Sequence, residues 1–81
     1  MIAESRVRLN YPKQLLHEPL LYRLIHDFNL ITNILQANVG PESGWLIVAI
    51  RGESGAIAQG LEWLASQGVK VDTLSRTTEE T

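Results

Sequence analysis

The chain contains no cysteine, and this absence excludes several kinds of site at once. Disulfide bonds, thiolate catalysis, iron–sulfur clusters and Cys-ligated zinc all need a residue that the 81-residue sequence lacks. An excess of one charge is also missing: the net charge is -2, which gives no electrostatic attraction to nucleic acid or anionic membranes. No apolar run approaches the ~20 residues that span a bilayer, and the N-terminal residues lack a signal-peptide pattern. We therefore expect a cytoplasmic protein without membrane insertion, nucleic-acid binding or a cofactor.

Residues that would carry catalysis or bind a metal are equally scarce. His17 and His26 are the only histidines, and no carboxylate completes a ligand set with them. The pair His26-Asp27 resembles part of a catalytic site. It falls on the polar side of a predicted helix, however, so we interpret both side chains as solvated. The segment 52–55 opens a helix, where anions bind, yet Glu53 disfavours phosphate and no P-loop spacing is present. We expect no catalytic residues, no metal site and no enzymatic activity.

The pattern of apolar residues predicts four strands and two helices. Alternation over residues 6–11 predicts a half-buried strand, which the following proline ends. An apolar stripe after Pro19 predicts a helix that stops near Asn29. A second helix is predicted between Ser54 as its N-cap and Gly68 as its C-terminal stop. The remaining expected segments are strands over 30–39, 45–51 and 69–74, and a polar, frayed tail over 75–81.

This order of elements predicts a ferredoxin-like α+β fold, β-α-β-β-α-β. Such a fold has one four-stranded antiparallel sheet with two helices on one face, and right-handed crossovers place the first and third strands at its centre. The length predicts a single domain over residues 1–81, with its core at about 6–74. Gly60 lies inside the second helix, where it costs about 1 kcal/mol relative to alanine. A close approach between that helix and the sheet would explain it.

The second strand of the central hairpin is apolar on both faces. Its two sets of side chains are Trp45, Ile47 and Ala49 on one side and Leu46, Val48 and Ile50 on the other. Because both helices cover the same face, one set lies on a face that no helix covers. Periodicity does not say which set this is. We therefore predict a C2 homodimer that pairs face to face or edge to edge.

One polar residue in the first strand of the hairpin is not explained by the apolar pattern. Asn33 lies within an apolar strand, and a buried amide needs hydrogen-bond partners. In one interpretation its side chain faces solvent or bonds to a neighbouring loop. In the other it recognises a small polar ligand, and the pattern alone leaves both open.

At Asn33-Ile34-Leu35 the chain resembles the NIL domain, whose signature these three residues spell. The resemblance continues in order from about Arg6 to Leu74. The matching segments are Val7-Arg8-Leu9, Pro19-Leu20-Leu21, Asp27-Phe28-Asn29, Asn33 to Val39, Glu62-Trp63-Leu64 and Gly68 to Val71.

NIL domains are ferredoxin-like relatives of ACT-type regulatory modules. They are best known at the C-terminus of the ATPase subunit of bacterial methionine importers, where they pair, bind methionine near the pair's interface and restrain transport. A second group is fused to a ferredoxin with Cys-rich clusters. This sequence has neither a Walker A motif nor cysteines. The resemblance therefore implies a stand-alone NIL domain.

The resemblance also implies a site. Asn33 matches the signature asparagine and is expected to contact the polar end of a ligand, while Ile34, Leu35 and Ala37 would line an apolar slot. The implied function is a small non-catalytic regulatory module that dimerises and senses methionine or another amino acid. The alternative is a protein-interaction module that pairs, without a small ligand, with another NIL-containing protein such as a transporter subunit or a ferredoxin fusion.

Overall fold

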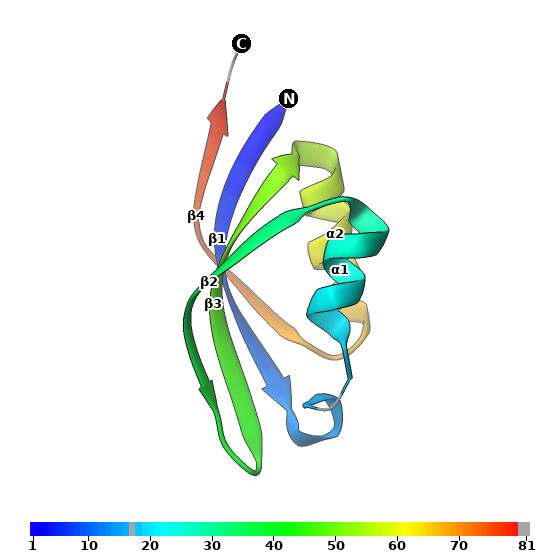
Figure 1. The fold of residues 1–81 in the computed structure, drawn as a ribbon, viewed down its shortest axis with the longest axis vertical. Coiled ribbons are helices and arrows are strands. Elements are labelled where there is room, and N and C mark those ends of the chain that lie inside the picture. Colours follow the sequence, from blue (N-terminus) through cyan, green and yellow to red (C-terminus); the bar gives the residue numbers. More distant parts are fainter. Residues whose placement is uncertain (17, 80–81) are drawn as a thin grey trace.

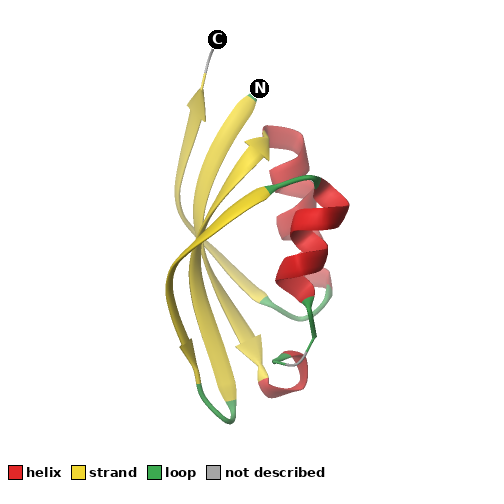
Figure 2. Cartoon of the chain, in the orientation of Figure 1, coloured by secondary structure: helices red, strands yellow, loops and turns green. Residues whose placement is uncertain are grey.

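The computed structural model describes residues 1–16 and 18–79. Its elements are β1 (Ile2–Pro12), the short 3-10 helix η1 (Lys13–Leu15), α1 (Leu20–Phe28), β2 (Ile31–Val39), β3 (Ser43–Glu53), α2 (Ser54–Ser66) and β4 (Lys70–Glu79). The strands form one antiparallel sheet in the order β2-β3-β1-β4. Both α-helices lie on one side of this twisted sheet, and no helix of the described residues lies on its other face (Figures 1 and 2). The ferredoxin-like α+β prediction is confirmed, with β1 and β3 at the centre.

The face of β3 that packs against the helices is now identified. Val48 and Ile50 are fully buried within the core, and Leu46 packs partly buried against it. Trp45 and Ile47 lie on the opposite, open face and are half-buried without any helix above them. The alternation of β3 therefore matches that of β1, whose Val7, Leu9 and Tyr11 also point into the core.

The helix ends follow local chemistry, with one exception. Asn29 takes the left-handed conformation (φ 54°) and its N–H donates to the carbonyl of Ile25, which ends α1. Gly68 has φ +104° and ends α2 as predicted. The prediction for Ser54 is wrong: it is the first helical residue, the N-cap position belongs to Glu53, and no side chain caps the helix.

Gly60 permits a close approach, although not the one predicted. A Cβ atom at this position would lie 2.7 Å from Leu24 Cδ1 on α1 and 3.2 Å from Leu30 Cδ1, just before β2. The glycine therefore lets α2 pack closely against α1 and the segment that follows it, rather than against the sheet. Beside this contact the rings of Phe28 and Trp63 lie 5.8 Å apart and tie the two helices together.

Three of the four strands are longer than predicted. β1 begins at Ile2 rather than at residue 6, β3 extends over Ser43–Glu53, and β4 continues to Glu79 instead of ending at 74. The polar segment expected to fray pairs with the first half of β1, for example Thr77 with Glu4. Backbone ladders need no apolar side chains, so hydrophobic patterning misses such extensions. Residues 80 and 81 of the expected tail lie outside the described residues.

Candidate functional site

The four residues that the resemblance implicates lie on one edge strand but do not converge. Asn33 is paired with Ala49 and therefore points to the open face of the sheet. Ile34 and Ala37 are paired with Val48 and Leu46, which places them on the helix side. The pairing register skips Leu35, so this residue is an extra one in β2.

These four side chains are all exposed in the single chain. Asn33 is thus not buried in the core, which favours the solvent-facing interpretation of its place in the strand. A slot that used Asn33 together with Ile34 would have to be completed around the edge of the sheet. Their contact with a ligand stays a prediction.

The β2 edge has an unusual composition for an unpaired strand. Its nine residues include no charged side chain and no proline, and all but Thr32 are exposed. Edge strands of monomeric proteins normally carry charges or prolines that prevent pairing with another chain. The opposite edge shows the contrast, since β4 carries Lys70, Asp72 and Arg76. Both edges contain one extra residue, so charge is the difference between them.

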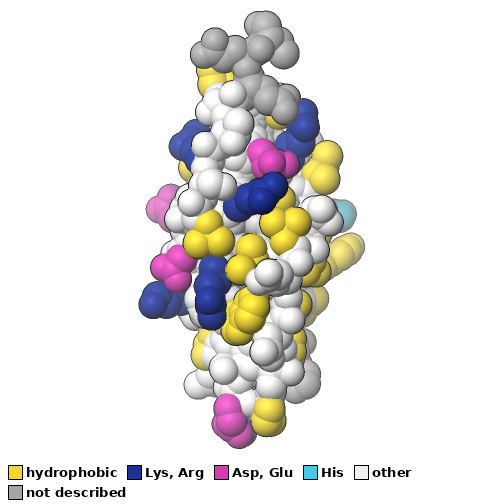
Figure 3. All heavy atoms as spheres, turned by 90° about the vertical axis from the view of Figure 1, so that its left-hand side faces the viewer, with side chains coloured by type: hydrophobic (Ala, Val, Ile, Leu, Met, Phe, Trp, Pro, Cys, Tyr) yellow, Lys and Arg dark blue, Asp and Glu magenta, His cyan; other side chains and the backbone are white. Residues whose placement is uncertain are grey.

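The open face of the sheet is less apolar than the two-sided pattern of β3 suggests. The guanidinium carbon of Arg8 lies 4.7 Å from the centre of the Trp45 ring, in a cation–π contact that covers part of the indole. The Arg8 Nε atom also donates to Asn10 Oδ1 at 3.3 Å. In the space-filling view, basic side chains lie among the apolar ones on this face (Figure 3). The apolar surface is therefore interrupted by charge.

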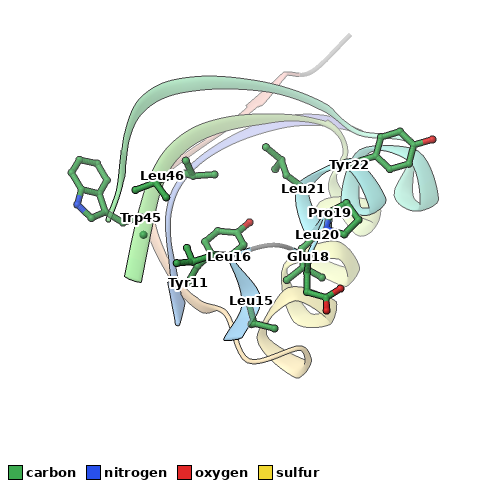
Figure 4. A pocket seen from close by; sticks show the side chains of 12 residues that line it. Tyr11, Leu15, Leu16, Glu18, Pro19, Leu20, Leu21, Tyr22, Trp45 and Leu46 are labelled. Atoms are coloured by element: carbon green, nitrogen blue, oxygen red, sulfur yellow. The ribbon is translucent and has the colours of Figure 1, made fainter. Parts of the chain in front are cut away.

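A cavity lies on the helix side of the sheet, beside the start of α1. Its volume is about 190 Å³, and apolar side chains dominate its wall. The side chains of Leu15, Leu16, Leu21 and Leu46 surround it, whereas the Trp45 ring points away on the other side of β3 (Figure 4). Among the described lining residues, the exposed Glu18 carries the one carboxylate.

Tyr11 places a polar atom in this apolar wall. Its side chain is 8% exposed, its hydroxyl is fully buried, and the hydroxyl has no hydrogen-bond partner among the described residues. The hydroxyl points into the space between the sheet and α1 (Figure 4). A buried, unpaired hydroxyl destabilises a fold by about 1–3 kcal/mol. The alternation over residues 6–11 puts Tyr11 on the same side of the strand as Val7 and Leu9, and nothing in that pattern indicates an unpaired hydroxyl.

Burial also raises the pKa of the Tyr11 phenol above its ordinary value of 10.0. Above about pH 10 the unfolded chain loses this proton while the folded chain keeps it, so folding stability should fall as the pH rises. When the pH rises from about 8 to about 11, we expect the free energy of unfolding to fall by roughly 1 kcal/mol less in Tyr11→Phe than in the wild type. Urea unfolding at the two pH values measures this difference. Tyr22→Phe removes an exposed phenol and is the matched control. A loss in Tyr11→Phe equal to that in the wild type would contradict this assignment.

The polar residues weighed for catalysis stand apart from this cavity. His26 Nδ1 lies 3.4 Å from Asp27 Oδ1, and both side chains are exposed on α1. No group of three or more potential metal ligands occurs within residues 1–16 and 18–79. His17 lies outside the described residues. Over the same ranges, no helix has the length and apolar character needed to cross a membrane.

Comparison with known proteins defines the class to which this architecture belongs. Residues 5–73 match the NIL domain family, so the chain belongs to the NIL domain family. In the crystal structure of the C-terminal domain of an ABC transporter ATP-binding protein from Enterococcus faecalis, the same fold is present with a TM-score of 0.77. That comparison has 20% sequence identity and covers 88% of this chain and 83% of the other.

Two relatives show how the domain occurs in longer and shorter proteins. The methionine import ATP-binding protein MetN 1 of Enterococcus faecalis is 33% identical over 75 residues, which cover 88% of this chain but only 21% of that protein. The chain thus spans about a fifth of that relative. An uncharacterized protein of Synechococcus elongatus is 33% identical over 73 residues, which cover 86% of this chain and 90% of that protein.

Proposed function

We propose that this chain is a cytoplasmic, non-catalytic regulatory module that pairs with a second copy of itself and binds a small amino acid, methionine first among the candidates. The observation that carries the proposal is the family match over residues 5–73, together with a relative named as a methionine import ATP-binding protein. The exposed Asn33 at the signature position supports a ligand contact on this strand.

The uncharged β2 edge supports pairing edge to edge. Two antiparallel β2 strands would join the two sheets into one of eight strands and would satisfy the outward N–H and C=O groups of each edge. Such pairing would also bring Asn33 and Ile34 of one chain next to the partner's edge. The ligand slot would then be shared between the two chains, which accounts for its incompleteness in one.

We expect isothermal titration with methionine to show binding, and Asn33→Ala to weaken it about tenfold, because a hydrogen bond to a charged group is worth about 1.5–3 kcal/mol. Asn38→Ala is the matched control, since Asn38 lies on the same strand, faces the same side opposite Trp45 and is also exposed. If the wild-type dimer binds no methionine at several millimolar, the ligand part fails. Equal affinity of Asn33→Ala and the wild type would remove Asn33 from the site.

A second candidate uses the same edge without a ligand. The β2 edge of this chain would pair with the NIL domain of a different protein, such as a transporter subunit or a ferredoxin fusion. The exposed, uncharged strand favours this reading as much as it favours self-pairing. Sedimentation separates the two, because this candidate leaves the purified chain monomeric.

A further inference from the structure

We propose that the cavity beside α1 is a second binding site. Its ligand is a small uncharged molecule, or the uncharged end of a larger one, that has an apolar body of about benzene size and one hydrogen-bonding group. The site is formed by the end of β1, by residues 15–16 and 18–22, and by the end of the β2–β3 hairpin. It lies on the helix side of the sheet, whereas Asn33 faces the open side.

The size of the ligand follows from the volume of the cavity. An apolar cavity of about 150 Å³ binds a benzene molecule. The space here is about 190 Å³, which admits a ring together with one small substituent. The leucine side chains from η1, α1 and β3 offer such a body dispersion contacts and no competing polar atoms.

The polar group of the ligand follows from Tyr11. The buried hydroxyl lacks a partner among the described residues and points into the space between the sheet and α1, on the side of the sheet where the cavity lies (Figure 4). A ligand hydroxyl or carbonyl at that position would satisfy it, and the complex would gain the hydrogen bond that the free protein lacks. A charged group is disfavoured deep in the cavity, because Glu18 is exposed at its surface and the other described lining residues carry no charge.

The test compares phenol with benzene, two probes that differ by the hydroxyl alone. Titration of isotopically labelled protein, followed by NMR, should give saturable shifts for residues that line the cavity. We expect phenol to bind the wild type about tenfold more tightly than benzene. In Tyr11→Phe this ratio should fall to one or below, because the phenol hydroxyl is then buried without a partner, and the affinity for benzene should be retained.

A filling variant tests the location independently. Leu21→Trp, on the α1 side of the cavity, should abolish binding of both probes, while Ile25→Trp, one turn further along α1 and outside the lining, should bind them as the wild type does. Failure of both probes to saturate in the wild type overturns the proposal, as does a phenol preference that survives Tyr11→Phe. Neither outcome depends on methionine binding or on pairing at β2, so this site and the proposed function can fail separately.

Discussion

Replacing Val48 with aspartate is expected to leave the chain unfolded in the absence of denaturant. Val48 has 0% exposure and lies among the apolar side chains of the core. The variant loses the transfer free energy of the buried valine side chain. It also has to bury an unpaired carboxylate or keep that carboxyl group protonated, and either costs further free energy. A chain of this length has a total stability of about 4–12 kcal/mol, so the combined loss removes most or all of it. Far-UV circular dichroism and urea titration measure the outcome.

The neighbouring substitution Ile47→Asp is the matched control. Ile47 carries a side chain of the same class on the same strand, but it points to the open face and is only half-buried. We expect this variant to stay folded with a loss of about 1–2 kcal/mol, since its carboxylate remains in contact with water. A stable Val48→Asp beside an unfolded Ile47→Asp would reverse the assignment of the two faces.

Leu35→Lys is expected to convert the proposed dimer into a monomer. Leu35 is the extra residue of β2 and is 40% exposed at the uncharged edge. Lysine is the residue that natural edge strands use against pairing, and in a two-fold dimer the substitution brings two like charges together. We expect the dimer to weaken at least about 100-fold. Sedimentation at tens of micromolar should then give the 9.1 kDa chain, where the wild type gives twice that mass.

Leu74→Lys controls for the substitution itself. Leu74 is the extra residue of β4, is 55% exposed and lies at the opposite edge of the sheet. The Leu74→Lys substitution should leave the proposed dimer unchanged if pairing uses β2. Loss of the dimer in Leu74→Lys instead would move the interface to β4, and its loss in a folded Ile47→Asp would move it to the open face. A wild type that is monomeric throughout would exclude self-pairing and leave the partner NIL domain as the alternative.

The architecture was predictable because its signals are local. Alternation in β1, the stripe of α1 and the stop at Gly68 each depend on a few neighbouring residues, and their order allows few topologies. The errors fell where local signals are weak. Thr77 has no apolar pattern and is held in a strand by the backbone of β1, and Ser54 is a good capping residue that the chain does not use as a cap.

The cavity could not be predicted, because it is formed by segments distant in the sequence. Tyr11 and Leu46 reach it from adjacent strands of the sheet, and Leu21 reaches it from the first turn of α1. A periodic pattern reports which side of a strand is buried, but not whether the space behind it is filled. Among the described residues the Tyr11 hydroxyl has no hydrogen-bond partner, and this depends on the positions of all the neighbouring side chains together.

The sequence by itself therefore determined the fold, the NIL family and the absence of cysteine chemistry, since these depend on residue types and their order along the chain. Only the tertiary structure decided that Val48 rather than Ile47 faces the core, because alternation in a strand apolar on both sides is symmetric. It also decided that Asn33 lies exposed on an uncharged edge, since a strand's place in the sheet depends on its partners.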